Sequence, residues 1–262
     1  MIKKFWSFFR RSNPNSFAAP ARRRLDLGDS DPAYPIYAIG DIHGCMDLLE
    51  AGEEKIINDI RNTGRKGLVV TLGDYVDRGR KSSAVISHLS SPDVKPFRRI
   101  ALCGNHDQAF LYAIEHPETI EEWLRFGGKE TLLSYGIDID HMRQRRQHMP
   151  LIIGRLLRDA VPDEHINFLR NLPVSLKIGR YLFVHAGIRP GIALGDQSDE
   201  DLMWIREPFL SAGSGLPLTV IHGHTPSPAP FMSQSRIGID TQAYSTGNLT
   251  ILKIDGQNVC LL

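Results

Sequence analysis

The 262 residues are enough for one large globular domain, and 42% hydrophobic with 23% charged residues is typical of a folded chain. Lys+Arg 31 against Asp+Glu 30 leaves a formal net charge of +1, which offers no overall field to attract nucleic acid. The three cysteines lack Cys-x-x-Cys spacing, which argues against a disulfide framework or zinc knuckle and for a reducing, cytoplasmic compartment.

The first 33 residues (1–33) are predicted to be an appendage. Residues 1–11 are basic and aromatic, but their apolar run is too short for a signal peptide. No run of the chain reaches the roughly 20 apolar residues of a transmembrane segment. Residues 1–11 suit either a weak contact with a membrane or partner, or an unbound tail. Residues 12–33, rich in Ser, Pro, Ala, Arg and Asp, read as a linker, so the domain is expected to span 34–262.

From residue 34 onward, short apolar runs that end at glycine or histidine predict buried strands. These runs are 34–40, 67–73, 98–104, 181–185 and 218–222. Helical patterns over 46–62 and 82–89 separate the first three runs. This alternation indicates βαβ units and a mostly parallel sheet.

Residues 108–172 are predicted to be mainly helical, with segments at 109–116, 120–124, 129–135 and 163–172. Pro162 followed by two acidic residues marks the start of the last segment. We expect this stretch to be an insertion over the carboxyl edge of the sheet. Strand-like runs follow it, and a second sheet packed on the first is the simplest arrangement for them. These runs are 236–240, 249–254 and 259–262.

Polar side chains of one chemical kind follow the predicted strands. They are Asp41, His43, Asp74, Asp77, Asn105, His106, His185 and His224. The carboxyl ends of neighbouring strands in an open α/β sheet converge on one crevice, so we expect these side chains to meet there. A single Gly-Asp is usually a turn and a single histidine is usually structural, but five such motifs in order are not expected by chance.

This set of donors predicts a centre with two metal ions. Carboxylate oxygens mixed with imidazole suit Mn, Fe or Zn, and a metal pair needs a shared carboxylate. Asp74 follows the middle strand and is the predicted bridge. Asp41 and His43, two residues apart along an extended strand end, would chelate one metal. The other would be completed by Asn105, His185 and His224.

The motifs Gly-Asp-x-His-Gly (40–44), Gly-Asp-x-Val-Asp-Arg-Gly (73–79), Gly-Asn-His-Asp (104–107), Val-His-Ala-Gly (184–187) and Gly-His-Thr (223–225) resemble those of the calcineurin-like metallophosphoesterases. Within this family the chain is most similar to the bacterial phosphoprotein phosphatases, over roughly residues 34–255. The resemblance implies an α/β fold, a four-layer αββα sandwich of two mixed sheets. It also implies a site for two divalent metal ions, and enzymes of this family are usually assayed with Mn²⁺. It also implies hydrolysis of phosphoproteins or small phosphate monoesters by direct attack of metal-bound hydroxide.

The same resemblance implies roles for individual residues, and its metal ligands are those assigned above. His106 would be the general acid for the leaving alkoxide, with Asp77 holding its ring in orientation. Arg78 and Arg206 would grip the phosphate, because planar guanidinium groups match its oxygens, and Asn105 would also contact it.

Two stretches instead resemble symmetrical diadenosine tetraphosphate hydrolases, which share this metal site. They are residues 123–136, with Trp123 and Gly-Gly-Lys-Glu-Thr-Leu at 127–132, and Gly-Ile-Asp-Thr at 238–241. Such substrates need a pocket for adenine and polyphosphate, for which the basic run 143–146 is a candidate. Gly-His-Thr in place of Gly-His-x-His argues against a nucleic-acid diesterase. A serine/threonine protein phosphatase is the preferred interpretation, and the nucleotide hydrolase is the alternative.

The motifs also depart from those of the eukaryotic phosphatases. Asp107 stands where those enzymes have Glu, and Ala186 stands where they usually have Gly. The chain also lacks their Ser-Ala-Pro-Asn-Tyr-Cys loop, with Tyr244 near that place. Binding of their regulatory subunits is therefore not inferred.

Overall fold

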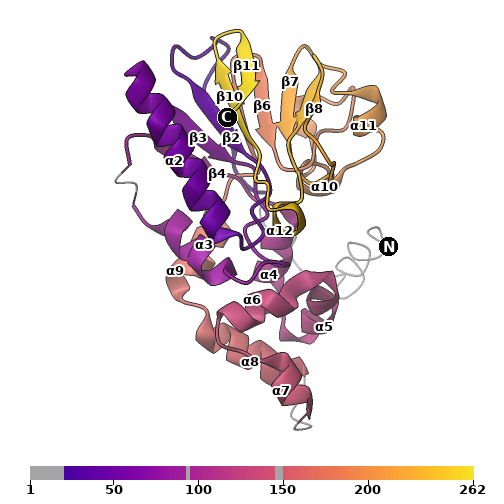
Figure 1. Ribbon diagram of the computed structural model, residues 1–262. Coiled ribbons are helices and arrows are strands. Elements are labelled where there is room, and N and C mark those ends of the chain that lie inside the picture. The colour runs from indigo at the N-terminus through magenta and orange to yellow at the C-terminus, as the bar shows by residue number, and fades with distance from the viewer. Residues whose placement is uncertain (1–20, 93–94, 145–149) are drawn as a thin grey trace.

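The computed structural model describes residues 21–92, 95–144 and 150–262, so the predicted contact segment 1–11 lies outside it. Two β-sheets lie face to face, with α2 (Met46–Thr63) outside one and α10 (Asp199–Trp204) outside the other (Figure 1). Each sheet contains parallel and antiparallel pairs. The predicted α/β sandwich of two mixed sheets is therefore confirmed. Within the described ranges, no helix is long and apolar enough to cross a membrane.

The first sheet has the strand order β11-β10-β2-β3-β4. Its strands are β2 (Ile36–Ile39), β3 (Leu68–Thr71), β4 (Arg98–Ala101), β10 (Ile251–Asp255) and β11 (Asn258–Leu261). The first three are parallel, as expected from the βαβ pattern. Assigning the last two strands to the second sheet was wrong, because β10 runs antiparallel to β2, with Leu252 opposite Ala38. A strand pattern in the sequence does not reveal which sheet edge the chain returns to.

The second sheet has the order β1-β5-β6-β7-β9-β8. Its strands are β1 (Arg24–Asp26), β5 (Ser175–Ile178), β6 (Tyr181–Val184), β7 (Thr219–His222), β8 (Phe231–Met232) and β9 (Arg236–Gly238). β1 lies in the predicted linker, and β5 and β8 had no predicted counterpart. The three residues of β1 carry no strand pattern of their own. Their conformation is stabilised by pairing with β5, where Leu25 lies opposite Leu176.

Alternating side chains of each strand separate the two faces of a sheet. Ile36 and Ala38 point into the core between the sheets, together with Phe183 of the second sheet. Tyr37 and Ile39 point the other way, into the cluster that includes Ile56 of α2. Strands that are buried on both faces explain why these runs read as continuously apolar.

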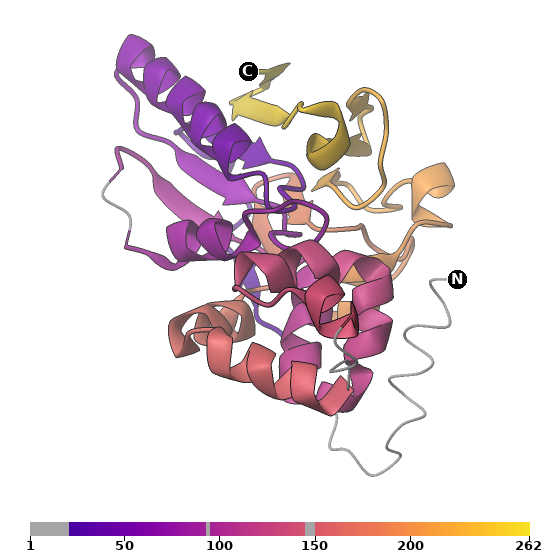
Figure 2. The same ribbon diagram turned by 60° about the horizontal axis from the view of Figure 1, so that its bottom comes forward.

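Helices α4 to α9 occupy the stretch predicted to be mainly helical. They are α4 (Asn105–Glu115), α5 (Ile120–Trp123), α6 (Lys129–Ser134), α7 (Ile139–Gln144), α8 (Pro150–Ala160) and α9 (Asp163–Asn171). Both views show them gathered at one end of the sandwich (Figures 1 and 2). Because α4 begins directly after β4, this is the end at which the parallel strands finish. The helices therefore border the site where the polar motifs meet.

Candidate metal centre

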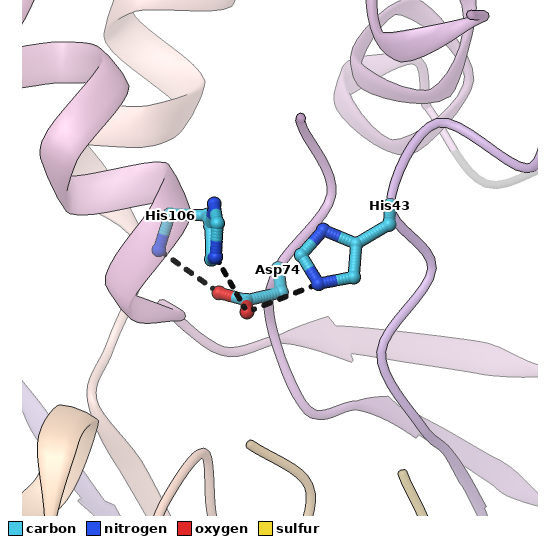
Figure 3. A group of neighbouring side chains, drawn as sticks. All are labelled: His43, Asp74 and His106. Atoms are coloured by element: carbon cyan, nitrogen blue, oxygen red, sulfur yellow. Dashed lines mark hydrogen bonds and ion pairs between the residues drawn. The ribbon is translucent and has the colours of Figure 1, made fainter. Parts of the chain in front are cut away.

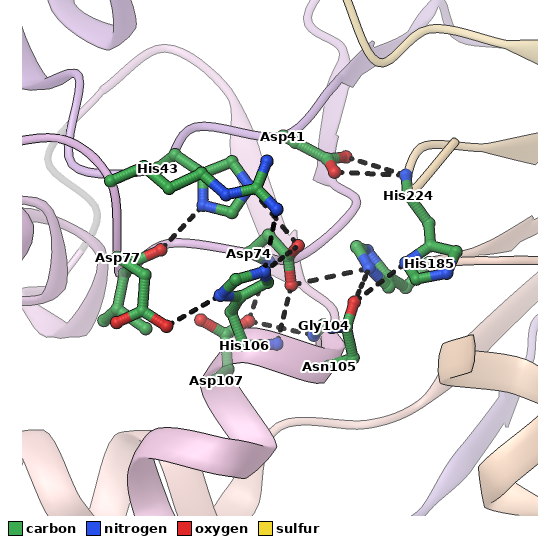
Figure 4. Close-up of polar contacts among 12 residues, drawn as sticks. Asp41, His43, Asp74, Asp77, Gly104, Asn105, His106, Asp107, His185 and His224 are labelled. Carbon is green, nitrogen blue, oxygen red and sulfur yellow. Dashed lines mark hydrogen bonds and ion pairs between the residues drawn. The ribbon is translucent and has the colours of Figure 1, made fainter. Parts of the chain in front are cut away.

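The polar residues that follow the strands of both sheets converge on one buried centre (Figure 4). Asp41 and Asp74 come from loops after β2 and β3, and Asn105 begins α4 after β4. His185 and His224 follow β6 and β7 of the second sheet. All five are at most 6% exposed. The structure thus brings the predicted metal ligands together from both sheets.

Two glycines allow these loops to approach so closely. A Cβ at Gly104 would lie 2.2 Å from Asp74 Oδ1, and a Cβ at Gly223 would lie 1.9 Å from Asp41 Oδ1. Both distances are far below van der Waals contact, so any side chain here would displace a carboxylate. The glycines of the motifs therefore have a steric role at the centre.

The Asp74 carboxylate lies between two imidazoles. Its Oδ2 is 3.5 Å from His43 Nε2, and its Oδ1 is 3.4 Å from His185 Nε2 (Figures 3 and 4). Among the described residues, possible ligand atoms form two groups that share Asp74, each with all atoms within 4.8 Å. One group is His43, Asp74 and His106, and the other is Asp41, Asp74 and His185. The position of Asp74 suits a shared ligand.

His43 and His185 present unprotonated nitrogens to the centre. Nδ1 of His43 donates to the carbonyl of Val76 at 2.7 Å, and Nδ1 of His185 donates to that of Leu72 at 3.0 Å. Burial lowers the pKa of His43 well below its usual value and that of His185 to about 4. Each neutral ring therefore carries its one proton on Nδ1 and turns the lone pair of Nε2 inward, as metal-binding histidines do.

Several acceptor atoms face one another in this arrangement, with no proton between them. His185 Nε2 lies 2.7 Å from Asn105 Oδ1 without a proton to share. Nδ1 of His224 donates to the same oxygen at 2.9 Å, so its Nε2 is unprotonated. That Nε2 is buried and has no hydrogen-bond partner in the described part of the chain. A cation would satisfy these lone pairs, so the donor set fits divalent metals.

The carboxyl groups of the centre have raised pKa values, and burial is the largest cause. Burial raises the pKa of Asp41 well above its usual value, and Asp240 and Asp74 raise it further. Burial raises the pKa of Asp74 to about 6. Clustered carboxylates that repel one another are stabilised by a bound cation.

His106 and Asp77 form a hydrogen-bonded pair beside this centre. His106 Nδ1 is 2.7 Å from Asp77 Oδ2, and Asp77 also accepts hydrogen bonds from Trp123 Nε1 and Thr131 Oγ1. Arg78 Nη2 donates to His106 Nε2 at 3.2 Å, which places the ring's proton on Nδ1, facing Asp77. Burial lowers the pKa of His106 to about 3, so the ring is neutral.

The two predicted phosphate-binding arginines border the donor groups. Arg78 Nη1 donates to the hydroxyl of Tyr244 at 3.1 Å, and its backbone N–H donates to Gly127 O at 3.1 Å. Arg206 Nη2 donates to the carbonyl of His224 at 3.4 Å. The Arg206 Nε is buried and has no hydrogen-bond partner among the described residues. Both guanidinium groups thus keep donors near the centre for an anionic ligand.

One detail of the expected geometry was wrong. β2 ends at Ile39, and His43 has φ 44°, so it lies in a turn rather than along an extended strand end. The turn is held by the N–H of His43, which donates to the carbonyl of Asp74 at 2.7 Å. Asp41 and His43 still face the same centre, but a turn places them there.

Two buried carboxylates at the site were missing from the predicted set. Asp107 accepts the backbone N–H groups of Asp74, Tyr75 and Gly104 at 2.8–2.9 Å, and so braces the loop that carries Asp74. Asp107 lies three residues after the N-cap Gly104 and accepts its backbone N–H, which is the acidic half of a capping box; this acidic position was the available signal. Asp240 lies near Asp41 and is 4% exposed. It belongs to the Gly-Ile-Asp-Thr stretch (238–241), whose resemblance to symmetrical diadenosine tetraphosphate hydrolases did not predict a place for Asp240 at the site.

Comparisons with known proteins agree with this geometry. A family model described as calcineurin-like phosphoesterase matches residues 34–255. The chain is 26% identical to serine/threonine-protein phosphatase 2 of Salmonella typhimurium over 86% of this chain and 95% of that protein. It is 31% identical to the symmetrical bis(5'-nucleosyl)-tetraphosphatase of Dechloromonas aromatica, over 59% of this chain and 44% of that protein. A crystal structure provisionally named a diadenosine tetraphosphatase superposes with a TM-score of 0.59 at 18% identity, over 92% of this chain and 97% of that chain.

Proposed function

Because this chain belongs to the calcineurin-like phosphoesterase family, we propose that it is a metal-dependent phosphomonoesterase acting on phosphoserine and phosphothreonine in proteins. The observation that carries the proposal is the convergence of two metal-ligand groups, a His106–Asp77 pair and Arg78 on one buried centre. The likeness to serine/threonine-protein phosphatase 2, which spans nearly the whole of both chains, supports the choice of substrate.

In this proposal Asp74 would be shared by two divalent ions, which we take to be Mn²⁺, with Fe or Zn suited to the same donors. One ion would be held by Asp41 and His43, and the other by Asn105, His185 and His224. The ligand atoms that lie within 4.8 Å of one another divide differently, with Asp41 beside His185 and His43 beside His106. Such ions, when bound, lower the pKa of a coordinated water from about 15.7 to near 7 and neutralise phosphate charge.

The protein's own residues would bind the phosphate and protonate the leaving group. Arg78 and Arg206 provide guanidinium donors for the phosphate oxygens. In the structure Arg78 occupies the Nε2 side of His106 as a donor, so His106 cannot hold a proton there. A bound phosphate is a better acceptor for Arg78 and would draw it away. Nε2 could then take up a proton, and Asp77 would stabilise the charged ring through Nδ1–H.

The second candidate is a symmetrical bis(5'-nucleosyl)-tetraphosphatase, favoured by the 31% identity to such an enzyme. Residues 123–136, which resemble these hydrolases, contact Asp77 and Arg78, and either reaction would use these contacts. Trp123 and Thr131 donate to Asp77, and the Gly127 carbonyl accepts the N–H of Arg78. This stretch therefore supports the catalytic pair without identifying the substrate. The basic run 143–146, the predicted polyphosphate contact, has no described side chains.

A Mn²⁺-dependent competition would separate the two candidates. The protein is offered a phosphothreonine peptide and diadenosine tetraphosphate, with Asp74→Asn as the control for contaminating activity. We expect higher kcat/KM on the peptide. Faster conversion of the dinucleotide to two ADP would overturn the phosphatase proposal and leave the nucleotide hydrolase.

A further inference from the structure

The ring of Phe126 lies flat against the imidazole of His106. The two rings are stacked, with centroids 4.1 Å apart and planes inclined by 18°. The ring of His43 meets the same imidazole edge-on, with centroids 4.7 Å apart and planes inclined by 87°. The His106 side chain is only 2% exposed, whereas Phe126 is half-buried. One flat face of the imidazole is therefore covered by Phe126.

This stack restricts a motion that the hydrogen bond to Asp77 leaves open. The contact of His106 Nδ1 with Asp77 Oδ2 at 2.7 Å fixes one atom of the ring, but the ring plane can still tilt about that contact. The last torsion of a histidine side chain has broad energy wells, so the side chain alone does not select one plane. Nε2 of the ring lies 4.0 Å from Asp74 Oδ2 and so faces the centre (Figure 3). A tilt of the ring would redirect Nε2.

Phe126 is itself held in place by the turn that carries it. Residues Leu124–Gly128 form a single π-helical turn between α5 and α6, and such turns are frequent at functional sites. Gly127, with φ 116°, accepts the N–H of Arg78 on its carbonyl at 3.1 Å, which ties the turn to the loop of Asp77 and Arg78. The ring of Trp204 in α10 packs on Phe126 from the other sheet, with centroids 5.5 Å apart. Phe126 is thus a fixed surface for the imidazole.

We propose that Phe126 is a positioning residue that sets the plane of the His106 imidazole, so that Nε2 points at the leaving group of the substrate. This inference rests on the proposed function, in which His106 protonates that group. Phe126 exchanges no proton and acts only through His106. A misplacement of about 1 Å in a reacting group can cost roughly 10²-fold in rate, so loss of the stack should be visible in kcat.

The test compares two substrates whose leaving groups differ in their need for a proton, using the full chain with Mn²⁺. Phe126→Leu keeps an apolar side chain but loses the flat ring. It should lower kcat on a phosphothreonine peptide by about 10-fold with KM unchanged, as part of the roughly 10²–10⁴-fold that acid catalysis contributes. On p-nitrophenyl phosphate, whose leaving group needs little protonation, kcat should fall by less than about 2-fold. Phe126→Tyr, which keeps the ring, should restore the wild-type ratio of the two kcat values.

Two controls separate positioning from a general loss of structure. Phe168→Leu removes another half-buried ring, which lies on α9 against the ring of Tyr75, and should leave the ratio of the two kcat values unchanged. Calorimetric titration with Mn²⁺ should give the same stoichiometry and affinity for Phe126→Leu as for wild type. His106→Asn is measured beside them on both substrates.

Three results would count against the inference or its premise. An unchanged kcat of Phe126→Leu on the peptide, beside a large loss in His106→Asn, would overturn the role of Phe126 alone. Equal losses on the two substrates with a lower Tm would show that Phe126 only stabilises the fold, and would also overturn it. Wild-type turnover of the peptide by His106→Asn would refute the acid assignment itself, which separates that failure from a failure at Phe126.

Discussion

The Nδ1 of His106 lies 2.7 Å from Asp77 Oδ2, at a place where both side chains are almost fully buried. Trp123 and Thr131 hold the same carboxylate from α5 and α6, so the ring is oriented through residues of the helical stretch. The Phe126 ring stacks against the face of the His106 imidazole, with the two ring centroids 4.1 Å apart. The imidazole is thus fixed by packing as well as by its hydrogen bond.

If His106 is the general acid, His106→Asn should lower turnover of an alkyl phosphate by roughly 10²–10⁴-fold with Mn²⁺ binding retained. Asp77→Asn should lower it less, because the acid remains but loses its orienting charge. Both losses should shrink on an aryl phosphate, whose leaving group needs little protonation. Steady-state kcat on the two substrates measures this. Wild-type turnover of the alkyl phosphate by His106→Asn would rule out the acid assignment.

Asp107→Asn should destabilise the fold by about 2 kcal/mol, because an amide replaces a buried carboxyl that accepts three backbone N–H groups. Asp138→Asn is the matched control. Asp138 also accepts a backbone N–H, that of His141, but at an exposed helix start where Asn serves equally well. Urea denaturation of the metal-free proteins measures both. Equal effects of the two substitutions would contradict the bracing role of Asp107.

Glu53 is predicted to make stability depend on pH in the acid range. It is 1% exposed and is paired with His88, Lys95 and Arg99. Burial raises its pKa, but the hydrogen bonds from His88 and Lys95 outweigh burial and hold the pKa of Glu53 below its usual value. A carboxyl with a lowered folded pKa stabilises the fold above its unfolded pKa of about 4.3. That stabilisation is lost as the pH falls through the folded value.

Glu53→Gln should therefore cost about 3 kcal/mol at pH 7, since it removes the carboxylate from buried Arg99. The difference from wild type should be constant above about pH 5 and shrink below the unfolded pKa. Asp47→Asn, which removes the exposed pair with Lys81, should cost under about 1 kcal/mol. Denaturation curves from pH 3 to 7 test this, and a pH-independent difference for Glu53→Gln would refute it.

Tyr244→Phe should raise KM with little change in kcat. The Tyr244 hydroxyl accepts from Arg78, and the Arg78 guanidinium carbon lies 4.9 Å from the centre of the Tyr244 ring. Phe keeps the ring but loses the hydrogen bond, worth about 1 kcal/mol, or roughly 5-fold in KM. Tyr244→Ala should raise KM further, because the cation–π contact is also lost. A lower KM in Tyr244→Phe would show instead that Tyr244 holds Arg78 away from the substrate.

Much of the centre could be predicted without coordinates because its parts are local. Each ligand motif follows a buried apolar strand, and parallel strands end at a common edge, so Asp41, Asp74 and Asn105 had to lie near one another. The alternation of strands and helices likewise indicated the parallel part of the first sheet. The resemblance of the motifs then pointed to the phosphoesterase family, which the match over residues 34–255 shows.

Other features depend on contacts between distant residues and leave no local pattern. β1 is a strand because β5 lies beside it, and β10 joins the first sheet because β2 offers an edge. In the sequence, Asp107 and Asp240 look like ordinary acidic residues. In the fold, Asp107 lies beside loop N–H groups and Asp240 lies near Asp41. Local sequence thus determined which residues carry donor groups suited to a metal and at which end of the sheet they lie. Burial, which removes water and makes every unpaired donor or charge costly, determined which neighbours hold them in place.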